Sequence, residues 1–157
     1  MSMLSEQEKQ EIRHEMAHYE DPRAASIEAL KVIQKNHGWV SDEQLKAAAD
    51  VLGMSAEQLD SVATFYNLIY RRPVGRHVIK LCDSVACHIM GYDQLRERLK
   101  EKLGIGLGQT TLDGRYTLLP IPCLGTCDHA PAMLVGDDLH RDLEDVTKVD
   151  AILERYP

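Results

Sequence analysis

Four cysteines are the residues of this sequence best suited to chemistry, and they fall into two pairs. The first pair, Cys82 and Cys87, encloses four residues in CDSVAC. The second pair, Cys123 and Cys127, encloses three residues in CLGTC. Two loops that each offer two thiolates can close a site for one tetrahedral metal ion or for a bimetallic cluster. Each pair follows an apolar stretch, VIKL or LLPIP, so we expect both loops to emerge at strand ends and to share one site.

The choice of metal depends on the loops, because four sulfurs suit a structural zinc ion and a [2Fe–2S] cluster alike. Zinc pairs most often enclose about two residues and tolerate up to about four, so spacing leaves zinc open. A two-iron cluster is wider and carries about −2 formal charge when oxidised and about −3 when reduced, so it needs longer loops whose N–H groups point at sulfur. Asp83-Ser84 and Leu124-Gly125-Thr126 can supply such turns, and Gly125 lets the backbone approach closely. The loops therefore favour iron.

Other interpretations of these residues are weaker. A thioredoxin-type dithiol needs C-x-x-C, which neither pair has. Four unrelated buried thiols would be ordinary in composition, because cysteine is a common core residue. His88 and His129 lie beside the pairs and raise a site with two imidazoles on one iron. Since four thiolates already complete the ligand set, we interpret both histidines as loop residues that tune the site.

A second motif, HEMAH at residues 14 to 18, fits the H-E-x-x-H pattern of zinc proteases. On a helix, His14 and His18 lie one turn apart on one face, where both could bind Zn²⁺ while Glu15 served as general base. The flanking residues argue against this. Glu20 is acidic where the protease helix usually turns apolar, and Asp21-Pro22 ends the helix almost at once. We predict a solvent-facing helix and no protease activity.

The first part of the chain, residues 1–73, predicts a helical bundle. One helix runs from Ser5 to Tyr19, and a second opens at Asp21-Pro22 and ends at Gly38. Two further helices open with capping boxes, SDEQ at residues 41–44 and SAEQ at residues 55–58. Apolar residues recur at helical spacing along these segments, and on the last helix they are Leu59, Val62 and Phe65.

The second part, residues 74–157, predicts an α/β domain. Pro73 and Gly75 mark the boundary between the two parts. The expected elements are a strand in HVIKLC, a helix in YDQLRERLKEKLG, a strand pair around Asp113-Gly114, a strand in AMLV and a closing helix in VTKVDAILERY. Three glycines in LGIGLGQT follow a helix rather than a strand, so they predict a helix C-cap and a turn instead of a nucleotide-binding loop. The fold class is therefore α+β with an α/β second part.

The net charge of the chain limits the classes of partner that it can bind. Twenty-five acidic against eighteen basic residues give a formal charge of −7, which disfavours nucleic acid and anionic lipid and makes a protein partner the expected one. The start, MSMLSEQEKQ, has no basic and apolar signal pattern, and we expect a cytosolic chain without direct membrane insertion. Cytosolic thiols are kept reduced, which favours metal ligands over disulfides.

Four stretches of the sequence carry a resemblance to a known family. They are DPRAASIEALKVIQ, GWV, ATFYNLIYRRPVGRHVIKLCDSVACHIMGYDQL and CLGTCDHAPAML. Together they resemble the thioredoxin-like [2Fe–2S] ferredoxin family that supplies the E component of bacterial NADH:quinone oxidoreductase (respiratory complex I). The likeness covers nearly the whole chain from about Glu11 onward. It implies a helical N-terminal region before a thioredoxin-like domain, and a [2Fe–2S] cluster on Cys82, Cys87, Cys123 and Cys127.

The resemblance also implies a role and a partner. In that family the ferredoxin docks beside the component that binds FMN and NADH, in the peripheral arm at the cytoplasmic face of the inner membrane. NADH delivers two electrons as hydride and the flavin accepts both, whereas an iron–sulfur cluster takes one. We therefore expect a subunit of an enzyme, with no catalysis from this chain alone. Related chains serve NAD-linked formate dehydrogenases and hydrogenases, and a zinc-stapled adaptor protein is the alternative of another class.

Overall fold

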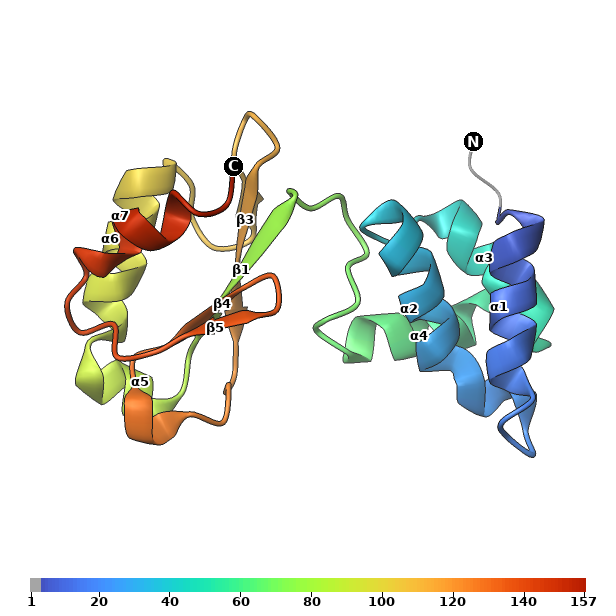
Figure 1. The fold of residues 1–157 in the computed structure, drawn as a ribbon. Coiled ribbons are helices and arrows are strands. Elements are labelled where there is room, and N and C mark those ends of the chain that lie inside the picture. The colour runs from blue at the N-terminus through green and yellow to red at the C-terminus, as the bar shows by residue number, and fades with distance from the viewer. Residues whose placement is uncertain (1–3) are drawn as a thin grey trace. The chain divides into compact units, whose positions relative to one another are not determined.

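The computed structural model describes residues 4–157, which form two compact units. The first unit ends at Pro73 and the second begins at Val74. Each unit buries a separate cluster of apolar side chains. The predicted fold class, a helical N-terminal region followed by a mixed domain of helices and a sheet, is confirmed (Figure 1).

The first unit is built from helices alone in its described part. They are α1 (Glu6–Met16), the 3₁₀ turn η1 (Pro22–Ala25), α2 (Ser26–His37), α3 (Asp42–Leu52) and α4 (Ala56–Phe65). Both predicted capping boxes are present, and a third closes the start of α1 between Ser5 and Glu8. Gly38 ends α2 in the left-handed conformation, as its position predicts. The core of the unit includes the fully buried Ile12, Leu30, Ile33 and Leu59.

Two details of the first unit differ from the sequence prediction. Helix α1 ends at Met16 rather than Tyr19, because the chain must leave the helical conformation before the Asp21-Pro22 bend. Phe65 has the apolar spacing of a core residue but is 81% exposed. It is the last residue of α4, and Tyr66 after it is extended, so the side chain lies beyond the packed part of the helix.

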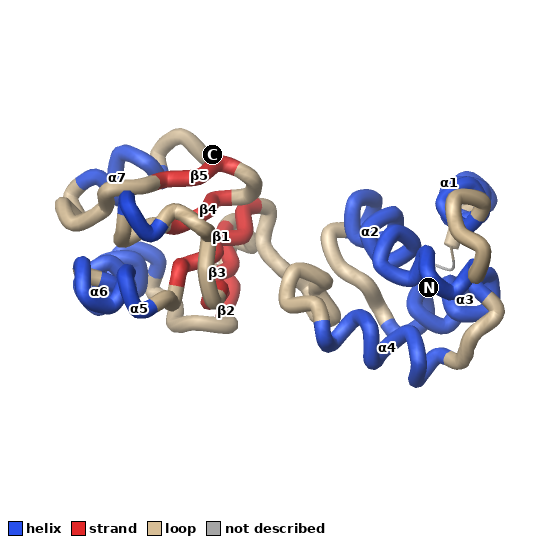
Figure 2. Tube along the Cα trace, turned by 90° about the horizontal axis from the view of Figure 1, so that it is seen from below, coloured by secondary structure: helices blue, strands red, loops and turns tan. Residues whose placement is uncertain are grey.

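The second unit contains a five-stranded sheet in the order β2-β3-β1-β4-β5. The strands are β1 (His77–Cys82), β2 (Gln109–Thr110), β3 (Tyr116–Ile121), β4 (Met133–Val135) and β5 (Asp138–His140). Strands β1 and β3 pair in parallel, and the other neighbours are antiparallel. Helices α5 (Val85–Met90), α6 (Tyr92–Leu103) and α7 (Lys148–Leu153) lie on the same side of the sheet (Figures 1 and 2).

The core of the second unit fills the space between this sheet and its helices. Leu81 and Leu118 from the central strands are fully buried, and so are Leu95 and Leu99 from α6. Helix α7 contributes buried Val149, Ile152 and Leu153, as its spacing predicts. Gly104 ends α6 in the left-handed conformation, so the glycine-rich segment after this helix begins as the expected C-cap.

Two elements of the second unit were not expected from the sequence. Helix α5 occupies the segment between and beyond Cys82 and Cys87, where hairpin-like loop structure was expected. Strand β5 adds a three-residue edge to the sheet. Both are short, and neither has a clear apolar alternation that could reveal it. Among the helices of residues 4–157, none combines the length and the apolar character that a membrane span requires.

Candidate metal centre

The sheet brings the two cysteine pairs to one edge. In the parallel pairing of β1 with β3, Cys82 lies opposite Ile121, so the carboxyl ends of the two strands are level. Cys82 ends β1, and Cys123 follows two residues after the end of β3. Figure 1 shows α5 and the short 3₁₀ turn η2 (Cys127–His129) at this same end of the unit. The two cysteine loops therefore emerge at adjacent strand ends, as their apolar flanks predict.

The two pairs differ in exposure. Cys82 and Cys87 are buried in the core of the second unit, whereas Cys123 and Cys127 are exposed, and all four are free thiols. The Sγ atoms of the exposed pair lie 3.9 Å apart. The Gly125 amide donates a hydrogen bond of 3.3 Å to Cys123 Sγ, and Gly125 has a φ of 71°, which a residue with a side chain would rarely adopt. The loop thus turns a backbone N–H toward sulfur.

The thiols act on one another, both within a pair and between pairs. Burial raises the pKa of Cys87, and the neighbouring Cys82 raises it further despite a hydrogen bond from Ser84. The pKa of Cys127 is raised chiefly by its hydrogen bond with Cys123 and by the charge of that thiol, with a contribution from Cys82 across the site. For Cys82, burial raises the pKa, but hydrogen bonds from Ser84, Cys87 and backbone amides outweigh it and lower the pKa overall.

The thiols of the site do not ionise independently. A neighbouring thiol raises the pKa of Cys87 and of Cys127, and a cationic metal bound between the sulfurs would favour their thiolate forms. Within residues 4–157, no three histidine, cysteine or carboxylate side chains converge closely enough to ligate one single metal ion. The four thiols are arranged as two pairs at adjacent strand ends, and a [2Fe–2S] cluster takes two thiolates on each of its irons. The donor set and its pairing fit such a cluster.

The two histidines beside the pairs are held by carboxylates. His88 Nε2 lies 2.6 Å from Asp83 Oδ1, and His129 Nδ1 lies 3.0 Å from Asp142 Oδ1. His88 also packs its ring against Tyr92, with centroids 4.3 Å apart. Both imidazoles therefore have partners other than the thiols, which agrees with interpreting them as loop residues.

The H-E-x-x-H segment on the first unit has a different character. The rings of His14 and His18 meet edge to face with centroids 4.9 Å apart, and His18 Nδ1 lies 3.6 Å from Glu15. His18 falls beyond the end of α1, so the two histidines do not share a continuous helix. The segment contacts itself at the surface, as expected for the solvent-facing interpretation.

One residue at the centre escaped the sequence interpretation, which assigned Ser84 only to a turn. Ser84 occupies the N-cap position of α5, but its side chain makes no capping hydrogen bond. Its Oγ lies 3.6 Å from Cys82 Sγ instead. An N-cap serine in a sequence normally predicts a bond to the helix, so only the folded arrangement reveals this orientation.

Comparison with known families assigns the chain. The family described as thioredoxin-like [2Fe–2S] ferredoxin matches residues 12–157. The chain belongs to this family. Two curated relatives are each named as the E component of NADH-quinone oxidoreductase. The one from Pseudomonas aeruginosa is 54% identical over 154 residues, and the one from Escherichia coli is 56% identical over 153 residues. Each alignment covers 98% of this chain and 92% of the relative.

This ferredoxin also resembles part of a larger protein of known structure. Two solved structures of NAD⁺-reducing [NiFe]-hydrogenase, air-oxidised and reduced, match with TM-scores of 0.63 and 0.69 at 28% and 25% identity. The matches cover 71% and 81% of this chain but only 19% and 22% of the hydrogenase chains. Family membership confirms the expected thioredoxin-like ferredoxin and makes a [2Fe–2S] cluster its cofactor.

Proposed function

We propose that this chain is the electron-transferring E component of NADH:quinone oxidoreductase, with Cys82, Cys87, Cys123 and Cys127 as the ligands of its [2Fe–2S] cluster. One observation carries the assignment of the ligands: the two cysteine pairs meet at the level carboxyl ends of β1 and β3. The identity of 54–56% to proteins of that name, over almost the full length of both chains, supports the host complex.

The residues of the chain divide the work of holding the cluster. When bound, a [2Fe–2S] cluster accepts and returns one electron at a time. Cys82 and Cys87 anchor it against the core, where strand β1 and helix α5 fix their positions. Cys123 and Cys127 bring it to the surface, and the Gly125 amide offsets negative charge on sulfur. The exposed pair therefore forms the side at which electrons enter and leave.

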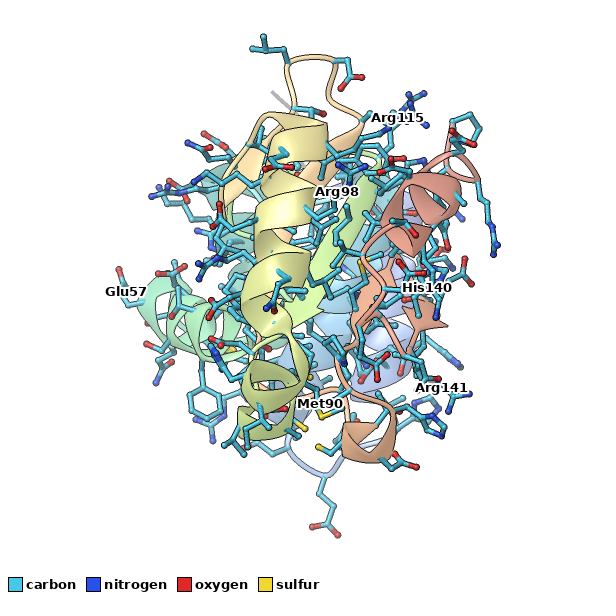
Figure 3. The ribbon with its side chains drawn as sticks, turned by 90° about the vertical axis from the view of Figure 1, so that its left-hand side faces the viewer. Glu57, Met90, Arg98, Arg115, His140 and Arg141 are labelled. Carbon is cyan, nitrogen blue, oxygen red and sulfur yellow. The ribbon has the colours of Figure 1, made fainter. Side chains whose placement is uncertain are left out.

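The partner we propose is the component of the same complex that carries FMN and the NADH site. This ferredoxin shows no nucleotide-binding loop in its sequence, so oxidation of NADH must take place on another chain of the complex. Apolar side chains on α5 adjoin the cysteines and are open to contact: Val85 is 75% exposed, Ile89 76% and Met90 46%. Figure 3 shows Met90 at the α5 end of the unit, with Arg115 toward the opposite end. An exposed apolar patch of this kind suits a protein interface. The pair formed by this chain and the FMN-bearing component would lie in the peripheral arm of the enzyme, at the cytoplasmic face of the membrane.

Anaerobic purification followed by metal and sulfide analysis tests the cluster directly. We expect two irons and two acid-labile sulfides per chain, a red-brown colour and a spin-one-half EPR signal after reduction. Zinc in stoichiometric amount without sulfide would instead support the zinc-stapled adaptor. The isolated chain should not oxidise NADH, whereas NADH should reduce its cluster once the FMN-bearing partner is added. Failure of that reduction in a stable complex would contradict the electron-transfer role.

A component of an NAD-reducing hydrogenase is the second candidate function, because solved hydrogenase structures match the fold. Their identity of 25–28% is about half that of the quinone oxidoreductase relatives. Affinity purification of the tagged chain from its own cells separates the two hosts. Co-purification of quinone oxidoreductase components supports the first candidate, and co-purification of a nickel-containing hydrogenase supports the second.

A further inference from the structure

Ser84 behaves differently from the other N-cap serines of the chain. Ser5, Ser41 and Ser55 each accept a hydrogen bond from the backbone N–H three residues later and form a complete capping box. Ser84 has the same extended backbone, with φ −87° and ψ 162°, but its hydroxyl makes no such bond. The hydroxyl lies 3.6 Å from Cys82 Sγ. It is therefore directed at the cysteines at the expense of the helix it precedes.

The position of this hydroxyl is fixed beside the first cysteine pair. Ser84 lies in the segment between Cys82 and Cys87, directly before the first residue of α5, and its Oγ is within hydrogen-bond reach of Cys82 Sγ. Once Cys82 is a metal-bound thiolate it has no proton to donate, so the Ser84 hydroxyl becomes the donor to negatively charged sulfur.

Thr126 provides a second hydroxyl on the opposite loop. It directly precedes Cys127, is 8% exposed, and its Oγ1 is a buried atom without a hydrogen-bond partner. It caps no helix, because the turn η2 that follows it receives no side-chain cap bond. A buried hydroxyl left unpaired is destabilising, because it has lost its hydrogen bonds to water without replacement. Because Thr126 directly precedes Cys127, an acceptor bound by the cysteine loops would lie near this hydroxyl.

We propose that Ser84 and Thr126 each donate a hydrogen bond to a sulfur of the bound cluster and thereby raise its reduction potential. The inference rests on the proposed function, in which the four cysteines hold a [2Fe–2S] cluster. Reduction adds one negative charge, so a hydrogen bond to sulfur is stronger in the reduced state and favours it. Both residues are positioning residues: they act on the cluster through its sulfur atoms and contribute no ligand to iron.

The test is a potentiometric titration of the full-length chain with its cluster, followed by the EPR signal of the reduced form. We compare the native chain with Ser84→Ala and Thr126→Val, which remove only the hydroxyl function. At the midpoint potential of the native chain, each variant should show a ratio of reduced to oxidised cluster lower by about tenfold, equivalent to about 59 mV. Thr126→Ser retains a hydroxyl and should keep the native value.

A matched control uses a serine remote from sulfur. Ser61 donates its hydroxyl to the Glu57 carbonyl on the first unit, and Ser61→Ala should leave the potential unchanged. A loaded variant of Ser84 or Thr126 with the native potential would overturn the assignment for that residue. If Ser84→Ala failed to load, Ser84→Gly takes its place, because glycine also lacks the hydroxyl and is well tolerated at an N-cap position. A lowered potential in Ser84→Gly supports donation by Ser84, and the native potential refutes it. Failure of the proposed function would give a different result, because neither the native chain nor any variant would then carry iron and sulfide.

Discussion

Glu8 joins the start of α1 to the end of α2, and its removal should destabilise the helical unit. The side chain is almost fully buried, and its Oε2 accepts hydrogen bonds of 2.8 Å from the Ser5 amide and hydroxyl. Its other oxygen lies 2.7 Å from His37 Nε2 and 3.3 Å from the Asn36 amide nitrogen. Replacing Glu8 by alanine removes all four contacts at once.

The size of the effect follows from these contacts. The capping box is worth about 1 kcal/mol, and a hydrogen bond to a charged group about 1.5–3 kcal/mol. We use the lower of these energies for the bond with His37, because the His37 side chain is 28% exposed and can hydrogen-bond to water after the substitution. We therefore expect Glu8→Ala to lower the free energy of unfolding of the first unit by roughly 2–3 kcal/mol at pH 7.

This loss should depend on pH in one direction. Burial raises the pKa of Glu8, but hydrogen bonds from Ser5, His37 and Asn36 outweigh it, so the pKa lies below its ordinary value. A carboxyl with a lowered pKa in the folded state stabilises fully above its unfolded pKa, about 4.3, and the contribution is lost as the pH falls through the folded value. The gap in stability between the native chain and Glu8→Ala should therefore narrow below about pH 4.

The single tryptophan of the chain provides the assay. Trp39 follows Gly38 at the end of α2, so its fluorescence during urea unfolding reports on the first unit. Glu11→Ala on the same helix is the matched control, because within the described residues the Glu11 side chain accepts only an exposed hydrogen bond from Gln7. Equal urea midpoints for Glu8→Ala and the native chain at pH 7, or a gap that widens in acid, would refute the reasoning.

Three further predictions concern the second unit and its partner. Cys123→Ser should abolish or weaken cluster binding, because a hard alkoxide poorly replaces a thiolate, whereas His129→Ala should retain iron and sulfide; the reverse result would overturn the ligand assignment. Gly75→Ala should lower the free energy of unfolding by about 2–3 kcal/mol or more, since its Cβ would lie 2.8 Å from the backbone of β3. Gly106→Ala is the control, because its Cβ would lie 3.5 Å from a flexible side chain, and it should leave the free energy of unfolding nearly unchanged. Urea unfolding followed by circular dichroism measures both. A chain beginning at Val74 should keep its cluster but co-purify less with the FMN-bearing partner, and equal binding would show that the helices do not dock.

Much of the fold could be predicted because local signals agreed with tertiary packing. The capping boxes at Ser41 and Ser55 begin α3 and α4, and Gly38 ends α2, as the sequence indicates. Helix α5 escaped because its apolar residues Val85 and Ile89 point outward, so no buried face gives it a helical period. The prediction for Phe65 was wrong in the opposite direction. Its spacing suits a core position, but Phe65 is the last residue of α4 and its side chain is exposed.

The site could be predicted in location more readily than in detail. Apolar stretches before each cysteine pair indicate strand ends, and parallel pairing of β1 with β3 makes those ends level. The direction of a hydroxyl is not encoded in this way. Ser84 occupies the same N-cap position as the capping serines, but its hydroxyl lies beside Cys82 Sγ and makes no bond to the helix. Its role therefore becomes visible after the loops are placed together.

The unequal burial of the two cysteine pairs meets two requirements of an electron-transfer site, access from the surface and rigid attachment of the cluster. Electron exchange with a partner requires one side of the cluster at the surface, and the exposed Cys123 and Cys127 lie on a loop that ends in a short turn. Exposed thiolates alone would hold the cluster loosely, because loops resist displacement less than packed elements. Cys82 and Cys87 supply the rigidity, since Cys82 ends a buried strand and the Cys87 side chain is itself part of the buried core. Substitution at the exposed pair should thus alter contact with the partner as well as the cluster, whereas substitution at the buried pair should also loosen the core of the second unit.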